Sequence, residues 1–102
     1  MNGIIYNQQV QTLRIIEAHL AALVRGLQAC PENALDYAEA LEFQLFQLRQ
    51  ASLEQAIQVE DRIAALILGI KSCPENALDY AEALEFQLFQ FGEIIKTLSQ
   101  QE

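Results

Sequence analysis

Apolar residues recur every three to four positions through almost the whole chain, which is the spacing of amphipathic helices. Over residues 6–27, one stripe contains Tyr6, Val10, Leu13, Ile16, Leu20, Leu23, Val24 and Leu27. Similar stripes follow over residues 34–48, 53–70 and 77–98. No stretch has the strict alternation of apolar and polar residues that is typical of a strand. The pattern therefore predicts an all-α protein.

The chain contains an internal repeat. The sequence CPENALDYAEALEFQLFQ runs from Cys30 to Gln47 and again from Cys73 to Gln90, an offset of 43 residues. The flanking helical stretches follow the same offset more loosely, so that the position of Glu17 corresponds to that of Glu60. Because a chain of 102 residues has the length of one domain, we predict a single all-helical domain, residues 1–102, with repeats over residues 6–48 and 49–91.

Each repeat has a proline between its two helical stretches, Pro31 in the first and Pro74 in the second. Proline is tolerated in the first turn of a helix but not in its interior, so each proline is expected to end one helix and open the next. Short connections of this kind favour antiparallel neighbours. The sequence therefore predicts two tandem αα-hairpins packed as a four-helix up-down bundle.

The junction between the repeats, residues 48–53, allows two interpretations. Ser52 and Gln55 have the spacing of a capping box, which would begin a separate third helix. However, the junction contains neither Gly nor Pro, and an apolar stripe continues across it with an interruption only at Ser52. The alternative fold is therefore a three-helix chain with a long continuous central helix, completed by dimerisation.

The net charge of −8 comes mainly from the repeated block. Its two copies contain eight of the fourteen acidic residues and no Lys or Arg. Such a surface repels phosphate backbones, so direct nucleic-acid binding is not expected. The longest apolar run, residues 63–70, is far shorter than the roughly 20 residues that cross a membrane. Since the first residues also lack the pattern of a signal peptide, we expect a soluble cytoplasmic protein that does not enter a membrane.

Two glutamates are candidates for metal binding. Glu17 and Glu60 occupy equivalent positions within apolar stripes, where four-helix carboxylate sites place their ligands. Such sites usually add a Glu-x-x-His pair, but residues 39–42 and 82–85 have this spacing with a second glutamate in place of histidine. The alternative is that both side chains lie at the edge of the stripe and reach water or an arginine. A metal- or apolar-ligand-binding bundle is therefore a secondary hypothesis, and no cofactor is expected.

The chain offers little for catalysis. A cysteine nucleophile needs a base and an orienting group, but Cys30 and Cys73 each precede a proline and His19 is the only histidine. Two cysteines are too few for a disulfide scaffold and lack the paired spacing of a zinc site. A Gly-rich phosphate loop and a Ser-His-Asp set are also missing from the sequence. We therefore expect a protein that is not an enzyme.

The outer faces of the second and fourth predicted helices carry aromatic residues beside a column of acids. The residues concerned are Phe43, Phe46, Phe86, Phe89, Glu39 and Glu82. Leaving four phenylalanines in water would expose more apolar surface than monomers usually tolerate. The leading hypothesis is therefore a non-enzymatic interaction or scaffold protein that forms a homodimer and binds a protein partner. A third hypothesis is an acidic inhibitor that mimics a polyanion.

Overall fold

Four long helices make up most of the chain. The computed structural model describes residues 2–51 and 53–100, with side chains from residue 8 onward. The helices are α1 (Asn2–Ala29), α2 (Ala34–Gln50), α3 (Ile57–Ser72) and α4 (Ala77–Ser99). Short 3-10 turns, η1 (Pro31–Asn33), η2 (Glu54–Ala56) and η3 (Pro74–Asn76), precede the last three helices. No strand occurs in the described ranges, and the prediction of an all-α protein is confirmed.

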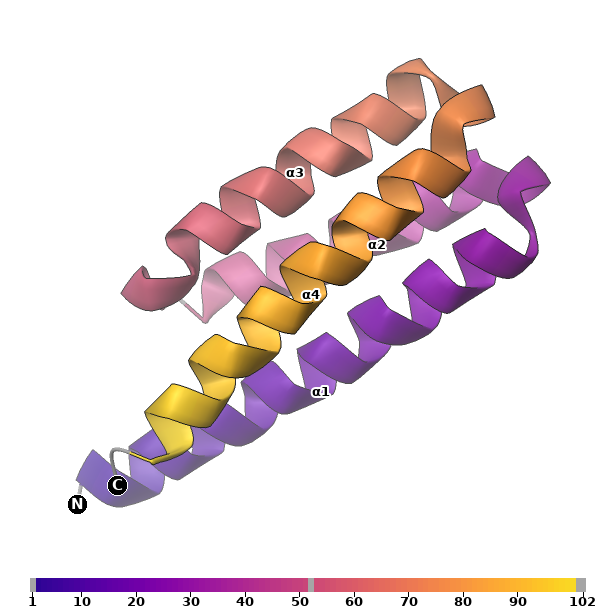
Figure 1. Cartoon of the computed structure of the whole chain (residues 1–102). Coiled ribbons are helices and arrows are strands. Elements are labelled where there is room, and N and C mark those ends of the chain that lie inside the picture. The colour runs from indigo at the N-terminus through magenta and orange to yellow at the C-terminus, as the bar shows by residue number, and fades with distance from the viewer. Residues whose placement is uncertain (1, 52, 101–102) are drawn as a thin grey trace.

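The helices form an elongated bundle measuring 48 × 19 × 17 Å (Figure 1). Around the bundle the order is α1, α2, α3, α4, and α4 closes the ring by packing against α1. The beginning of α1, the end of α4 and the α2–α3 connection lie at one end, and the two proline turns lie at the other. Each helix is therefore antiparallel to its two neighbours, and the predicted four-helix up-down bundle is confirmed.

The two proline turns have the same structure. In the first, α1 ends at Ala29, and the backbone N–H of Asn33 donates to the carbonyl oxygen of Cys30 at 3.0 Å. In the second, Asn76 donates to Cys73 in the same way at 2.9 Å. The turns η1 and η3 contact each other at their end of the bundle. The repeats therefore pack with their turns side by side.

The chain reverses direction at the junction between the repeats. Helix α2 ends at Gln50, and Leu53 has an extended backbone with φ −91° and ψ 112°. The side chain of Leu53 is only 7% exposed, so the connection is anchored in the core. Because α2 and α3 pack against each other along the bundle, the alternative with a continuous central helix is not the fold of this chain. The proposed capping role of Ser52 lies outside the described residues.

The core runs along the bundle and is formed mainly by residues of the predicted stripes, although Leu23 is only partly buried and the side chain of Tyr6 lies outside the described residues. The largest fully buried side chains are Leu13, Leu20, Val24, Leu27, Leu41, Leu48, Ile63, Ile67, Ile70, Leu84, Phe91 and Ile95. Burial of each such side chain contributes about 1.5–3 kcal/mol. The outward positions of the helices are largely polar, and no described helix combines the length and the apolar character of a membrane span.

A tyrosine packs on a glycine in each hairpin. A Cβ atom added to Gly26 of α1 would lie 2.6 Å from Cε1 of Tyr37 in α2. The same close approach occurs between Gly69 of α3 and Tyr80 of α4. Both tyrosines are half-buried against the core. The glycines therefore let the aromatic rings reach the backbone of the preceding helix and set how closely the two helices of a hairpin approach.

Candidate interaction surface

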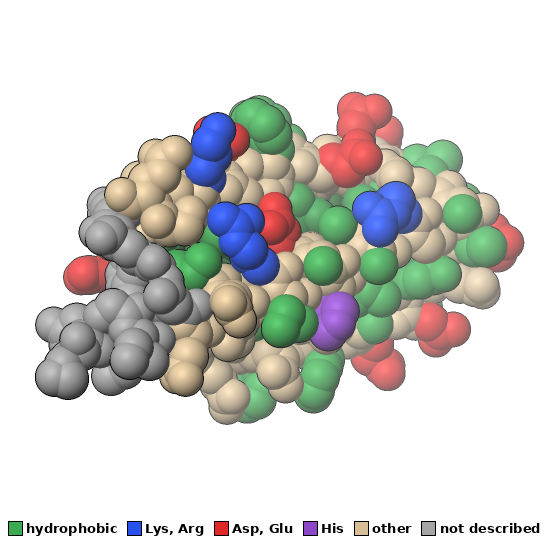
Figure 2. All heavy atoms as spheres, turned by 90° about the horizontal axis from the view of Figure 1, so that it is seen from below, with side chains coloured by type: hydrophobic (Ala, Val, Ile, Leu, Met, Phe, Trp, Pro, Cys, Tyr) green, Lys and Arg blue, Asp and Glu red, His purple; other side chains and the backbone are tan. Residues whose placement is uncertain are grey.

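Four phenylalanines from the repeated block lie on the surface of the bundle. Phe43 and Phe46 of α2 are each 57% exposed, and Phe86 and Phe89 of α4 are 58% and 66% exposed. Helices α2 and α4 lie diagonally across the ring, so the two pairs lie on opposite sides of the molecule. Other large exposed apolar side chains are Ile15, Leu35, Ile57, Leu68 and Leu78. Figure 2 shows such side chains reaching the surface between polar ones on one face.

Acidic side chains accompany the phenylalanines on the same two helices. Glu39 of α2 and its copy Glu82 of α4 are both exposed. The exposed acids nearer the turns are Glu32, Asp36, Glu75 and Asp79. These acids lie near the N-termini of α2 and α4, where the helix dipole favours negative charge. The outer faces of α2 and α4 thus combine an acidic part near the proline turns with an aromatic part farther along.

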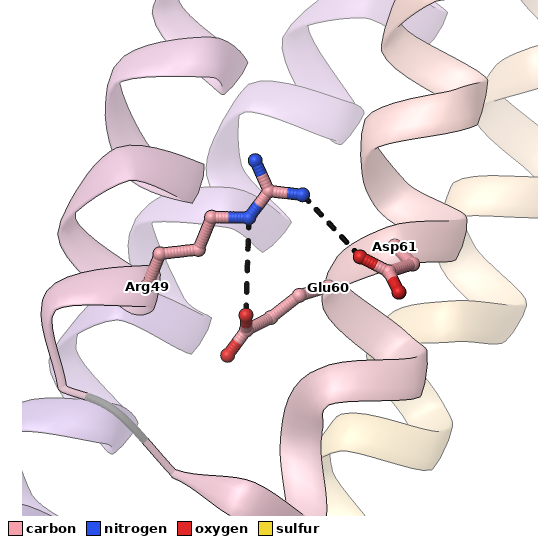
Figure 3. Close-up of polar contacts among 3 residues, drawn as sticks. All are labelled: Arg49, Glu60 and Asp61. Atoms are coloured by element: carbon pink, nitrogen blue, oxygen red, sulfur yellow. Dashed lines mark hydrogen bonds and ion pairs between the residues drawn. The ribbon is translucent and has the colours of Figure 1, made fainter.

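Glu60 is held by an arginine at the contact between α2 and α3 (Figure 3). Nε of Arg49 lies 3.8 Å from Oε1 of Glu60, and Nη2 of Arg49 lies 3.5 Å from Oδ1 of Asp61. Glu60 is only 6% exposed. Burial raises the pKa of Glu60, the nearby Arg49 guanidinium opposes this shift, and the Asp61 carboxylate adds to it. Of the two sequence-based interpretations of Glu60, the structure therefore matches the one in which it reaches an arginine.

Glu17 lies in a different place, in a groove between α1 and α4. The groove is lined by Glu17, Ala21, Val24, Arg25, Glu85, Leu88 and Phe89. A Cβ atom added to Gly92 of α4 would lie 2.7 Å from Oε2 of Glu17, so this carboxylate covers the glycine. Because α1 and α3 lie diagonally across the ring, the structure does not bring Glu17 and Glu60 together. In the described part of the chain, no group of three or more His, Cys, Asp or Glu side chains is arranged to hold a metal ion.

The histidine and the cysteines lie in separate parts of the molecule. Nδ1 of His19 lies 3.3 Å from Oε1 of Gln44, in a surface groove between α1 and α2 that Phe43 also lines. Cys30 and Cys73 are free, half-buried thiols at the proline turns. His19 is about 16 Å from Cys30 along α1, at 1.5 Å per residue. The structure therefore does not place the histidine beside either thiol as a general base.

Several residues that sequence reasoning did not single out depart from the repeat symmetry. Gln44 contacts His19, whereas its copy Gln87 is 8% exposed and its Oε1 has no hydrogen-bond partner among the described residues. Arg49 contacts Glu60, whereas the residue at its copied position is Gly92. Alignment of the two repeats at their offset of 43 residues would have revealed the change from Arg49 to Gly92, but not the difference between Gln44 and Gln87, because both lie in the identical block.

The described surface therefore presents aromatic, acidic and amide side chains on two opposite faces and a groove between α1 and α4. Aromatic residues at the centre of a patch with polar residues around it are typical of protein interfaces. The comparison of this chain with known protein families, with curated proteins and with solved structures finds no match.

Proposed function

We propose that this chain is a non-enzymatic helical interaction protein that associates with itself as a homodimer. The observation that carries the proposal is the exposure of Phe43, Phe46, Phe86 and Phe89, each more than half exposed in the single chain. Burying such a side chain is worth about 1.5–3 kcal/mol. Burial of two phenylalanines from each chain would therefore offset a substantial part of the cost of association, about 4–15 kcal/mol.

The dimensions of the bundle favour association along its length. A long face measures 48 by 19 Å, or about 900 Å², and a stable interface buries about 800 Å² per partner. An end of the bundle measures 19 by 17 Å, or about 300 Å², which is well below that requirement. The two pairs of phenylalanines lie on opposite long sides of the bundle, on α2 and α4, so a side-by-side dimer would cover one pair from each chain.

The net charge of −8 on each chain opposes association. At ordinary salt concentration, exposed charges are screened over about 10 Å, so the repulsion between the acidic faces is reduced. Self-association through apolar side chains is therefore expected to strengthen as salt is added. A contact held mainly by surface ion pairs would weaken under the same conditions.

The test is the mass of the protein in solution. Light scattering after size exclusion at micromolar concentration should give about twice the chain mass of 11.5 kDa. Combined Phe46→Glu and Phe89→Glu substitutions should lower the mass to that of one chain, because one of the two places a charge in the apolar contact whichever aromatic face forms it. Combined Ile15→Glu and Ile57→Glu substitutions serve as the control. They add the same charge at exposed positions on α1 and α3 and should leave the dimer intact.

A wild-type protein with the mass of one chain would contradict the homodimer. The aromatic faces would then be candidates for a different protein, and the exposed acids beside them favour a basic one. Titration with a basic amphipathic helical peptide would test this second candidate. Binding that requires Glu39 and Glu82 would support it.

A further inference from the structure

The two repeats make the α2–α3 contact and the α1–α4 contact equivalent. An offset of 43 residues relates α1 to α3 and α2 to α4. A residue of α2 that faces α3 therefore corresponds to a residue of α4 that faces α1. The two contacts nevertheless differ in their charged residues, because some cations of one repeat are absent from the other.

Cations of the chain pair with the carboxylates at the α2–α3 contact. Arg49 lies 3.8 Å from Glu60, and Nζ of Lys71 donates to Oε2 of Glu42 at 2.7 Å. Both pairs join α2 to α3. Glu42 and Glu60 on this side are therefore already paired with cations of the same chain.

The α1–α4 contact retains the carboxylates but lacks these cations. Glu17 and Glu85 stand at the copied positions of Glu60 and Glu42, whereas Gly92 replaces Arg49 and Gln28 replaces Lys71. Both glutamates line the groove between α1 and α4. Neither has an ion pair or a hydrogen bond with any residue that the structure describes. The two carboxylates of this groove are therefore unpaired among the described residues of the single chain.

One exposed cation lines the same groove at a place where it does not reach Glu17. Arg25 lies two helical turns after Glu17 on α1, about 12 Å away at 1.5 Å per residue. Ala21 lies midway between them and also lines the groove. Residues spaced by four share one helix face, so Glu17, Ala21 and Arg25 form a row with opposite charges at its ends and a small residue at its centre.

Such a row is complementary to itself under two-fold rotation. If a second copy lies antiparallel with the two-fold axis at Ala21, Glu17 of each chain faces Arg25 of the other. The small side chain of Ala21 permits close approach of the two α1 helices. Phe89, which lines the groove and is 66% exposed, would be covered by the same contact.

We propose that the occupant of the α1–α4 groove is a second copy of this chain, whose Arg25 pairs with Glu17 in both directions. The guanidinium that Glu60 receives from Arg49 within the chain is thus supplied to Glu17 by the partner. The charge complementarity of this row selects the α1–α4 face for the dimer over the α2–α3 face, whose carboxylates are already paired. This inference rests on the proposed self-association and names the face and the residues that produce it.

The test is an exchange of charges across the contact. Glu17→Arg and Arg25→Glu should each weaken dimerisation about tenfold or more, measured by sedimentation over a range of protein concentrations, because like charges then face each other. The double variant Glu17→Arg/Arg25→Glu should regain an affinity within about threefold of the wild type, because the exchange recreates both pairs. Recovery in the double variant also excludes misfolding as the cause of the single effects.

Matched controls come from the other repeat. Leu68→Glu places a glutamate at the copied position of Arg25, and Phe46→Glu changes the copy of Phe89. Both substitutions should change the dissociation constant of the dimer by less than about threefold, whereas Phe89→Glu should weaken the dimer. Gly92→Arg should also weaken the dimer, because it supplies Glu17 with a cation from its own chain.

The failure of this inference differs from the failure of self-association. A wild-type dimer that Glu17→Arg and Arg25→Glu affect no more than Leu68→Glu would overturn the α1–α4 contact and leave the homodimer standing. Failure of the double variant to recover would overturn the reciprocal pairing. A wild-type monomer would overturn both proposals and leave a cation from another protein as the occupant of the groove.

Discussion

Replacing a glycine of this bundle is expected to raise or lower stability according to which side chain packs against that glycine. Gly26 is covered by the rigid ring of Tyr37, whereas Gly92 is covered by the flexible end of Glu17. A ring held in a packed contact moves only with its neighbours, but a half-buried carboxylate rotates away at little cost. The same substitution is therefore expected to change stability in different directions at the two positions.

Gly92→Ala should raise the free energy of unfolding by up to about 1 kcal/mol, because alanine is favoured over glycine inside a helix. Gly26→Ala should lower it by about 1–3 kcal/mol, because the new methyl group would lie 2.6 Å from the Tyr37 ring. Urea unfolding at one fixed protein concentration measures both. Equal effects at the two positions would show that the tyrosine contact does not constrain the hairpin.

Glu60 links stability to pH. Burial raises its pKa above the ordinary glutamate value of 4.5, against the opposing effect of Arg49. The folded state therefore holds the proton more tightly than the unfolded state. This contribution to stability is fully present below about pH 4.5 and is lost as the pH rises through the raised pKa of the folded state.

Glu60→Gln should remove the loss of stability that the wild type shows as the pH rises, because glutamine does not ionise. The difference in unfolding free energy between Glu60→Gln and the wild type should increase in favour of the variant as the pH rises from 4.5, and then level off. Glu39→Gln removes the same charge from an exposed site and controls for the net charge of −8. Parallel pH profiles for the two variants would contradict a specific role of Glu60.

At the scale of elements, the connections decide how the helices associate. Each proline turn joins two helices that pack against each other, and its short length leaves an antiparallel arrangement as the compact solution. The α2–α3 connection contains no proline or glycine that would end a helix. It depends on Leu53, which leaves the helical conformation and is buried in the core.

Leu53→Ala should destabilise the protein by about 2–4 kcal/mol, because it removes a buried side chain that anchors the connection. Ile57→Ala is the control at the other end of η2, where the side chain is 48% exposed. It should change the unfolding free energy by less than about 1 kcal/mol. Chemical denaturation monitored by circular dichroism compares the two, and a Leu53→Ala effect as small as the control would show that the connection is not anchored by this residue.

At the scale of the whole molecule, the repeats are arranged with their proline turns in contact at one end of the bundle. Cys30 and Cys73 immediately precede these turns and therefore lie at the same end. In a chain with a continuous central helix of about 40 residues, the same cysteines would be roughly 60 Å apart. The cysteines thus report on the topology of the chain.

A short bis-maleimide should link Cys30 to Cys73 within one chain. Mass spectrometry after denaturing electrophoresis should detect a single chain carrying one bridging reagent, and Cys30→Ser should abolish the bridge. Links found only between chains would contradict the up-down bundle. The experiment is best done at low protein concentration, where encounters between chains are rare.

The sequence by itself determined the features that depend on local spacing. The apolar stripes, the identical blocks and the positions of Pro31 and Pro74 were sufficient to predict an all-α chain with two proline turns between helices, because helix periodicity and proline chemistry act within a few residues. The surface position of the four phenylalanines followed from the same periodicity.

Tertiary structure alone decided the features that depend on residues far apart in the chain. The stripe across residues 48–53 fits both a turn and a continuous helix, and only the packing of α2 on α3 with Leu53 in the core selects the turn. Glu17 and Glu60 are equivalent in the sequence, but one meets Gly92 and the other meets Arg49. The neighbour of a side chain across a helix–helix contact is set by how the helices close the ring, which no local pattern encodes.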